Sequence, residues 1–210
     1  MNYQGKFITV EGTEGAGKST NHTHIENFLQ AQNISYITTR EPGGTPVAEK
    51  IRELLLDKSN IGLCDDAELL LMFAARSQHL HELIIPALKE GQWVISDRFT
   101  DASYAYQGGG RGLSWDRISQ LEQWVQSDMS PEATILLDVP VEIGMQRVKD
   151  RGETDRFEEE QLSFFQRIRE AYHRLAKENP ERYYIIDTQP PSDIVKANLN
   201  QVLQQLIING

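Results

Sequence analysis

Residues 12–19 (GTEGAGKS) match the phosphate-binding pattern G-x-x-x-x-G-K-[ST], the P-loop. Glycines in such a loop let backbone N–H groups curl around a phosphate, and the helix that follows points its positive N-terminus at the same phosphate. Lys18 would then reach the β- and γ-phosphates, while the Ser19 hydroxyl would ligate Mg²⁺. Residues 6–11 read as a buried strand and residues 18–31 as a helix, which is the order that the motif requires. The sequence therefore predicts a nucleoside triphosphate as ligand.

A carboxylate and an arginine follow a second apolar run. Asp97 ends the strand-like residues 92–97, and Arg98 comes next. P-loop proteins place at such a strand end the carboxylate that helps to hold Mg²⁺. The arginine could grip a second phosphate close to the first, or it could form a salt bridge that closes the strand. Two phosphate-binding groups side by side favour transfer between two phosphates over transfer to water.

Three arginines, Arg147, Arg151 and Arg156, flank a polar segment between two predicted helices. A mobile basic segment at about residues 147–157 could close over a polyphosphate as a lid and bring positive charge to the transition state. The alternative is a solvated helix face whose charges pair four residues apart.

Two further motifs could contact the rest of a nucleotide. Phe73 and Arg76 are three residues apart and share one helix face, so the ring could stack on a base while the guanidinium bonds its edge. Phe73 taken alone fits a core position as well. Residues 40–45 (REPGGT) contain two glycines that permit close approach of a ligand, and Pro42 stiffens the turn. An ordinary strand-to-helix turn would have the same composition.

The composition limits the class of protein. With 210 residues, 39% hydrophobic and 25% charged, the chain fits one globular domain. Its net charge of −10 argues against nucleic acid as a partner, because phosphate contacts need lysine or arginine. A single cysteine, Cys64, excludes an intramolecular disulfide and a thiolate cluster, and the five histidines lack metal-ligand spacing. We find no apolar run that could span a bilayer and no N-terminal leader, so we expect no membrane contact and a cytoplasmic location.

Strand-like and helix-like patterns alternate along the chain. This order predicts an α/β fold, in which a parallel sheet carries helices on both faces and binds its ligand at the carboxyl ends of the strands. Asp138 and Asp187 end two of the strands, so we expect them at that same edge. Beyond the two elements around the P-loop, the expected strands are 35–39, 92–97, 133–138 and 183–187, and the expected helices are 48–57, 66–80, 114–127, 157–177 and one from 192 onward.

Local signals refine these helices. Thr45 and Pro46 read as an N-cap and a first helical residue, and Ser114 reads as a second N-cap. Residues 66–80 are apolar on most sides, which predicts a helix buried in the middle of the protein. The helix at 157–177 has one apolar stripe, made of Leu162, Phe165, Ile168, Tyr172 and Leu175.

Taken together and in order, these motifs resemble the bacterial thymidylate kinase family. The motifs are residues 11–18, 39–45, 73–76, 96–98 and 105–111, and the match runs from about residue 5 to 190. The resemblance implies a P-loop NTPase fold of the nucleoside monophosphate kinase type, with a five-stranded parallel sheet in one domain over residues 1–210, and usually a homodimer. It also implies transfer of the γ-phosphate of ATP to dTMP, giving dTDP and ADP, with Mg²⁺, as a step of dTTP biosynthesis.

The resemblance also implies roles for individual residues. Catalytic roles fall on Lys18, Arg98, Arg151, Arg156 and Glu14. ATP would contact Gly12, Gly15, Ala16, Gly17, Lys18, Ser19, Thr20 and Arg147, and Mg²⁺ would contact Ser19 and Asp97. The dTMP molecule would contact Glu14, Pro42, Arg52, Phe73, Arg76, Arg98, Ser103, Tyr106 and Gln107. Among these, Arg98 would hold the phosphate, and Tyr106 would crowd the 2′ position of the sugar.

Two positions depart from the pattern of relatives. The stacking aromatic often lies four residues before the arginine, where this chain has Met72, so either Met72 or Phe73 faces the thymine. One branch of the family has an arginine just after the acidic residue of the P-loop, where this chain has Gly15. The resemblance is therefore to the branch whose catalytic arginine comes from the lid. Arg151 is our first choice for it and Arg156 the second, with Arg147 nearer the adenine.

Two other functions compete with this interpretation. One is a kinase for another nucleotide or for a nucleoside, which only substrate preference can separate from the first. The other is a GTPase-type switch, which would need the motifs N-K-x-D and D-x-x-G, and the sequence contains neither.

Overall fold

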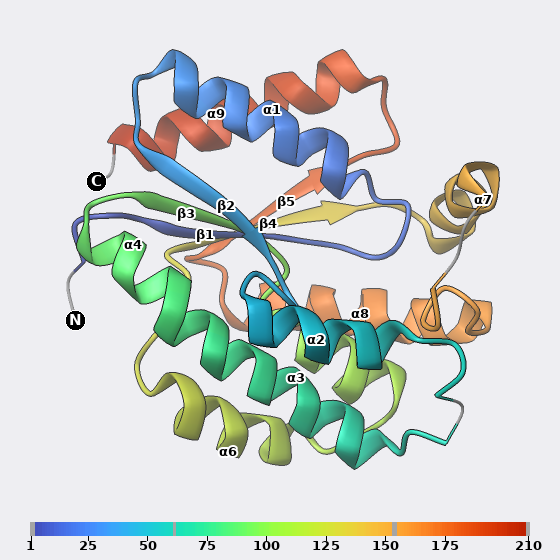
Figure 1. Ribbon diagram of the computed structural model, residues 1–210. Coiled ribbons are helices and arrows are strands. Elements are labelled where there is room, and N and C mark those ends of the chain that lie inside the picture. The colour runs from blue at the N-terminus through green and yellow to red at the C-terminus, as the bar shows by residue number, and fades with distance from the viewer. Residues whose placement is uncertain (1–2, 61, 153–154, 209–210) are drawn as a thin grey trace.

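The computed structural model describes residues 3–60, 62–152 and 155–208. Five parallel strands form one sheet in the order β2-β3-β1-β4-β5 (Figure 1). The strands are β1 (Phe7–Glu11), β2 (Tyr36–Arg40), β3 (Trp93–Asp97), β4 (Ala133–Asp138) and β5 (Tyr183–Asp187). The predicted α/β class with a five-stranded parallel sheet is confirmed.

Helices cover both faces of the sheet (Figure 1). On one face lie α1 (Lys18–Ala31) and α9 (Ser192–Ile208), and on the other lie α2 (Pro46–Leu56), α3 (Asp65–His79), α4 (Ile85–Lys89), α6 (Trp115–Gln126) and α8 (Leu162–Glu178). Helix α7 (Val141–Arg151) stands at the end of the sheet where β4 finishes. Three short helical segments complete the chain: η1 (Leu80–Ile84), α5 (Thr100–Ser103) and η2 (Tyr104–Gly110).

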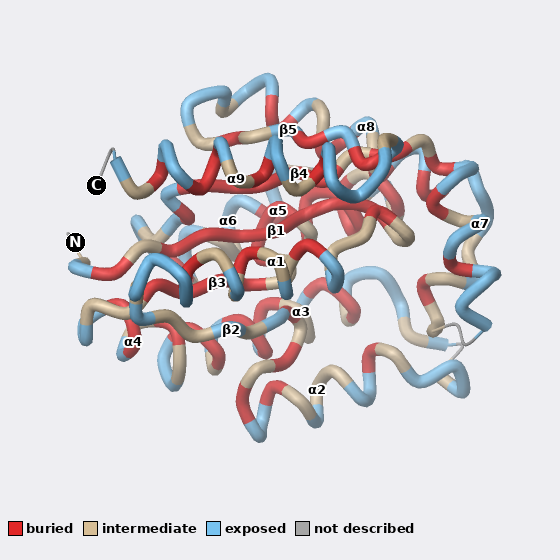
Figure 2. Tube along the Cα trace, turned by 90° about the horizontal axis from the view of Figure 1, so that it is seen from above, coloured by how far each residue is buried: buried red, intermediate tan, exposed pale blue. Residues whose placement is uncertain are grey.

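The central strands lie in the protein interior, as Figure 2 shows. All five residues of β1 are buried, whereas the edge strand β2 is only half-buried. Parallel strands with helices on both faces need apolar residues on both sides, which explains the continuous apolar runs of the sequence. None of the helices in the described ranges is long and apolar enough to cross a membrane.

Two predicted helix starts are confirmed in detail. Thr45 caps α2, its hydroxyl accepting a hydrogen bond from the backbone N–H of Ala48, and Pro46 takes the first helical position. Ser114 caps α6, its hydroxyl accepting from the N–H of Asp116.

Other helix predictions need correction. The helix predicted at 66–80 continues through the π-helical η1 into α4, and Pro86, which has no N–H to donate within the helix, lies directly after the π-helical segment. This helix is not buried all round either, since Leu70 is 55% exposed.

The helix predicted at 157–177 begins later, at Leu162. The Asp155 carboxylate accepts from the N–H groups of Phe157 and Glu158 and holds the preceding residues in a turn. Leu162 is exposed, unlike the rest of the predicted stripe.

The sequence prediction missed η2, because it contains three consecutive glycines, residues that disfavour helices. These glycines let α8 approach closely. A Cβ on Gly109 would stand 2.7 Å from the Cβ of Ala171, and one on Gly110 would stand 2.5 Å from the Phe164 ring. The helix before the predicted lid segment was given no bounds, and as α7 it extends far enough to carry Arg147 and Arg151, so these two arginines lie on a helix and not on a loop.

Candidate active site

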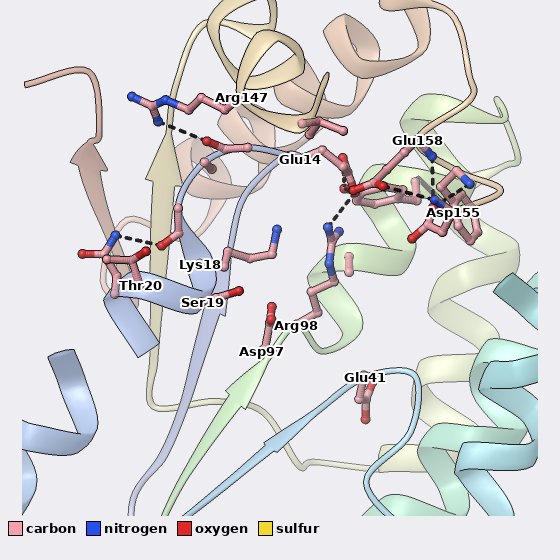
Figure 3. A pocket seen from close by; sticks show the side chains of 18 of the residues that line it. Glu14, Lys18, Ser19, Thr20, Glu41, Asp97, Arg98, Arg147, Asp155 and Glu158 are labelled. Atoms are coloured by element: carbon pink, nitrogen blue, oxygen red, sulfur yellow. Dashed lines mark hydrogen bonds and ion pairs between the residues drawn. The ribbon is translucent and has the colours of Figure 1, made fainter. Parts of the chain in front are cut away.

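A cavity of about 650 Å³ opens at the carboxyl ends of the strands (Figure 3). The P-loop and α1 form one wall, the end of β3 forms the floor, and η2 with the segment after α7 forms the opposite wall. The cavity is of the size that binds a small organic ligand.

The P-loop wall has the geometry of a phosphate site. Gly17 has a φ of 90° and directs the chain into α1, whose N-terminus faces the cavity. The Lys18 ammonium donates to the carbonyls of Gly12 at 3.1 Å and Thr13 at 3.3 Å. Burial, together with nearby Arg98, lowers the pKa of Lys18. This end of the cavity therefore offers a helix N-terminus and an amine to a phosphate.

Gly15 is bare because no side chain fits there. Its φ is 70°, and a Cβ would stand 2.0 Å from the carbonyl oxygen of Gly144 in α7. A Cβ on Gly144 would in turn stand 2.4 Å from the carbonyl oxygen of Glu14. Since both obstacles are backbone atoms, an arginine at position 15 would require α7 to move.

Arg98 reaches the same cavity from the end of β3. Its backbone has a φ of 71°, unusual for a residue with a side chain, and its N–H donates to Val10 O at 3.0 Å. Its guanidinium donates to Glu14 at 2.8 Å and lies 4.4 Å from the centre of the Tyr106 ring. The Tyr106 hydroxyl also donates to Glu14, at 2.7 Å. Burial opposes the charge of Arg98, but Tyr106 and Glu14 hold its pKa well above the ordinary value.

A buried network holds a second arginine at the far end of the cavity. Arg76 is only 2% exposed, and its Nε donates to Glu41 at 2.7 Å. Its Nη2 donates to Phe99 O at 3.1 Å and to the Ser103 hydroxyl at 3.0 Å. His79, on the other side of Glu41, lies 3.1 Å from that carboxylate.

The remaining nitrogen of Arg76, Nη1, is buried and has no partner among the described residues. Because a buried donor without a partner is unfavourable, this atom is suited to a ligand acceptor in the cavity.

Phe73 does not reach the cavity. Its ring is 2% exposed, and its centre lies 4.5 Å from the Arg76 guanidinium on the core side. Met72, the other candidate of the sequence analysis, lines the cavity instead.

The three arginines of the expected lid have different surroundings. Arg147 lines the cavity and donates to Gly15 O at 3.1 Å and Thr188 O at 3.0 Å. Arg151 also lines it and forms an ion pair with Glu158. Arg156 is directed elsewhere, donating to Glu68 at 2.6 Å and to Leu55 O at 2.8 Å. Of the predicted lid segment, residues 153–154 lie outside the described residues.

Most of the residues predicted for the site do line this one cavity. The exceptions are Gly12, Phe73 and Arg156. Those that it brings together are Glu14, Gly15, Ala16, Gly17, Lys18, Ser19, Thr20, Pro42, Arg52, Arg76, Asp97, Arg98, Ser103, Tyr106, Gln107, Arg147 and Arg151.

The sequence analysis missed the wall after β5, formed by Thr188, Pro190, Ser192 and Val195. The sequence did contain a signal for this wall, since the loop after a parallel strand lies at the edge of the sheet where ligands bind. In contrast, Asp138 and Asp187 do not line the cavity, and Asp138 pairs with Arg169 and His173.

The chemistry of Asp97 and Ser19 fits a divalent cation. Oδ1 of Asp97 is buried and has no partner among the described residues. Mg²⁺ takes few protein ligands and fills the rest of its shell with phosphate oxygens and water. The described residues contain no group of three or more His, Cys, Asp or Glu that could bind a metal by themselves.

The chain is similar to known proteins over nearly its whole length. The family model described as thymidylate kinase matches residues 10–199. A thymidylate kinase of Pseudomonas syringae pv. tomato is 54% identical over 97% of each chain, and one of Teredinibacter turnerae is 53% identical over 97% of this chain and 99% of its own. The crystal structure of thymidylate kinase from Ehrlichia chaffeensis is 34% identical, with a TM-score of 0.75, and covers 95% of this chain and 98% of its own. The chain therefore belongs to the thymidylate kinase family.

Proposed function

We propose that ATP and dTMP meet end to end in the cavity, and that its side chains assist transfer of the γ-phosphoryl group to the phosphate of dTMP. Membership of the family makes the chain a phosphotransferase that phosphorylates dTMP. The assignment of residues to steps is our own. The observation that carries it is the meeting of two cationic side chains suited to phosphates, Lys18 of the P-loop and Arg98 directly after β3, in one cavity.

The P-loop binds the donor in this proposal. Backbone N–H groups of residues 15–20 and the Lys18 ammonium hold the ATP phosphates. Gly12 acts indirectly, because its carbonyl accepts from Lys18 and so positions the amine. Arg147 and the wall after β5 stand beside the P-loop, where the adenosine part of ATP would lie.

Ser19 and Asp97 would hold Mg²⁺, which would neutralise charge on the phosphates. The chemistry asks for no strong general base, since the acceptor is already a phosphate anion. Positioning and charge neutralisation by the chain's own cations therefore carry the catalysis.

Arg98 holds the acceptor phosphate. Glu14 and Tyr106 fix its guanidinium from two sides, so the group is already oriented before substrate binds. Arg52 of α2 lines the same cavity, where it would assist at this phosphate. Glu14 and Tyr106 would also face the sugar, and the Tyr106 ring would crowd a 2′-hydroxyl.

Arg151 supplies the lid charge. It lines the cavity, whereas Arg156 is paired with buried Glu68. We therefore assign the transition-state role to Arg151 and an anchoring role to Arg156. Closure of this segment would also exclude water, which competes with dTMP as acceptor.

The thymine lies at the far end of the cavity. Arg76 Nη1 would donate to a base carbonyl, and Ser103, Gln107 and Pro42 would line the base. Met72 would contact the ring face, while Phe73 supports the Arg76 guanidinium from the core.

A homodimer is the proposed assembly. Val47 and Leu54 of α2 and Leu70 of α3 leave large apolar side chains exposed on neighbouring helices, a composition that suits a protein interface. The substrates are small metabolites, which fits the cytoplasmic location expected from the sequence.

A coupled assay of ATP with dTMP, dUMP, CMP and thymidine tests the proposal. We expect dTMP to be the best acceptor by a wide margin, with slow ATP hydrolysis when no acceptor is present. Preference for another monophosphate or for thymidine would assign the site to a different kinase. Guanine specificity with slow hydrolysis and no acceptor would indicate the switch-type alternative.

A further inference from the structure

Glu68 of α3 is a buried carboxylate that links the base end of the cavity to the segment after α7. Its side chain is 1% exposed. Oε1 accepts from Gln107 Nε2 at 2.8 Å and from Arg111 Nε at 3.4 Å. Oε2 accepts from Arg156 Nη2 at 2.6 Å and from Arg111 Nη2 at 3.3 Å. Arg111 and Arg156 supply three of these four hydrogen bonds, and Gln107 supplies the fourth. The oxygens of a carboxylate can only accept, so Glu68 accepts from Gln107 as well.

That property determines how Gln107 lies. Its side chain has a donor end, Nε2, and an acceptor end, Oε1. Because Glu68 accepts and does not donate, only the Nε2 end can face it. The Oε1 end has no hydrogen-bond partner within the described part of the chain, and Gln107 lines the cavity.

We propose that Glu68 is a positioning residue for base selection, which holds the Gln107 amide with its oxygen available to a pyrimidine N3–H. The inference rests on the proposed place of the base beside Gln107 and Arg76. Thymine carries a proton on N3, whereas neutral cytosine has a lone pair there. A glutamine free to turn over its amide would serve both bases, but one fixed by a carboxylate accepts from thymine alone.

Arg76 gives the matching half of the pattern. Glu41 holds its Nε just as Glu68 holds the Gln107 amide, and the unpartnered Nη1 is a donor. The far end of the cavity thus offers one fixed donor and one fixed acceptor, each set by a buried carboxylate. That pair complements a carbonyl next to an N–H, as in thymine, and opposes the amino group and bare nitrogen of cytosine.

Arg111 and Arg156 keep the anion in place. Burial alone would lower the pKa of Arg111, but Glu68 and Glu160 raise it. The Arg156 guanidinium lies 4.6 Å from the centre of the Phe157 ring, and Phe157 lines the cavity. One of the two residues that stabilise Glu68, Arg156, therefore comes from the segment that we propose to close over the substrates.

The test compares dTMP with 5-methyl-dCMP, which differ only at the 4-position and at N3. The measured quantity is the ratio of kcat/KM for the two substrates in wild type, Glu68→Gln, Gln107→Ala and the double variant. A glutamine at position 68 can donate as well as accept, so the Gln107 amide is free to turn over. We expect Glu68→Gln to lower the dTMP preference by about tenfold or more, since a fixed hydrogen-bonding site rejects a mismatched analogue strongly.

The double variant distinguishes positioning from general damage. If Glu68 acts through Gln107, Glu68→Gln has no further effect on the ratio in a Gln107→Ala background. A merely structural role would lower both kcat/KM values together and leave the ratio unchanged. Arg156→Gln is the matched control, because it removes one of the cations that hold Glu68 yet leaves Glu68 an acceptor for Gln107. We expect this variant to keep the preference for dTMP.

The outcomes separate this inference from the proposed function. If Gln107→Ala keeps the preference, the base does not lie against Gln107 and the proposed site is wrong there. If Gln107→Ala loses the preference while Glu68→Gln keeps it, the role of Glu68 is refuted and the proposed place of the base still holds. Should Glu68→Gln not fold, Glu68→Gln/Arg156→Gln carries the same test, because it removes one cation together with the anion.

Discussion

The two ends of the cavity are built in different ways. At the P-loop, the donor half of the phosphate end, the contacts are local and largely backbone, as when the Lys18 ammonium donates to the carbonyls of Gly12 and Thr13. At the base end, buried side chains hold one another across 35 residues between Glu41 and Arg76 and 39 residues between Glu68 and Gln107. A phosphate can be bound by one short segment of any sequence that supplies the right backbone. A particular base needs side chains brought together by the whole fold.

The largest expected effect concerns the lid. Arg151→Ala should lower kcat about a thousandfold, because an arginine that stabilises the transferring phosphoryl group contributes on that scale. Neither KM should rise by a comparable factor, since the contact forms mainly in the transition state. Steady-state kinetics with ATP and dTMP measure both.

Arg156→Ala is the matched control for this prediction. It lies five residues away and pairs with Glu68, so its loss should reduce thermal stability and affect kcat less than Arg151→Ala does. If instead only Arg156→Ala collapses kcat, the assignment of the lid arginine is wrong.

The next effect in size distinguishes the acceptor half of the phosphate end from the donor half. Arg98→Ala should lower kcat/KM for dTMP by roughly 100- to 1,000-fold, because it removes a largely buried charge partner of the acceptor phosphate. ATP affinity, measured by titration without dTMP, should stay nearly unchanged. The kcat/KM of Arg98→Lys for dTMP should lie between those of the wild type and Arg98→Ala, since lysine keeps the charge but loses the planar stacking on Tyr106. A parallel loss of ATP affinity would contradict the assigned role.

The contrast between the ends also explains what the sequence could reveal. The P-loop and the strand that precedes it were predicted because one segment contains both the pattern and its structural context. The strands were predicted within a residue or so, since parallel buried strands are short apolar runs. Residues 104–110 escaped prediction as a helix because glycine propensity opposes the packing that in fact decides their conformation.

The base end was less accessible for a physical reason. Met72 and Phe73 are adjacent on one helix, and periodicity alone does not fix the rotation of that helix against a ligand. Glu68 stands in the first turn of α3 beside two aspartates, a setting typical of a solvated helix start. Only the packing of α3 against η2 and the segment after α7 buries it, and no motif encodes that packing.

Gly44→Ala tests the contrast between side-chain support at the base end and backbone support at the P-loop, because each end contains a glycine that leaves no room for a Cβ. At a φ of 86°, a Cβ on Gly44 would stand 2.5 Å from the ring nitrogen of His79 and from the Thr39 hydroxyl, two atoms that hydrogen-bond each other. We expect a loss of about 1–3 kcal/mol in the free energy of unfolding, measured with urea, because overpacking forces such neighbours apart. The KM for dTMP should rise while that for ATP stays, since His79 supports Glu41 at the base end.

Because these obstacles are side chains, a second substitution can relieve them. Thr39→Ala should recover part of the stability in the Gly44→Ala background although it destabilises the wild type. Gly15→Ala is the counterpart at the phosphate end, where the obstacle is the Gly144 carbonyl and no side-chain change can help. The distinction between side-chain and backbone obstacles would be wrong if a neighbouring side-chain substitution restored the stability of both glycine variants equally, or of neither.

Glu11 is a second carboxylate at the phosphate end, besides Glu14, and its protonation can be followed by pH. Glu11 accepts from the N–H of Phe99 at 2.7 Å, next to the strained backbone of Arg98, and from the Tyr172 hydroxyl at 2.7 Å. Burial, with the nearby charge of Asp101, raises its pKa to about 8, against the opposing effects of Tyr172 and Arg98.

A carboxyl whose pKa is higher in the folded than in the unfolded state stabilises the fold fully at low pH, and this stabilisation is lost as pH rises toward the folded pKa. Between about pH 5 and pH 8 the wild type should therefore lose up to about 1.4 kcal/mol of unfolding free energy per pH unit from this group. Glu11→Gln resembles the protonated form and should flatten that slope in urea unfolding across the same range. Parallel curves for the two proteins would mean that Glu11 stays ionised, and the contrast between a backbone-held P-loop and a carboxylate-held base end would then rest on Glu41 and Glu68 alone.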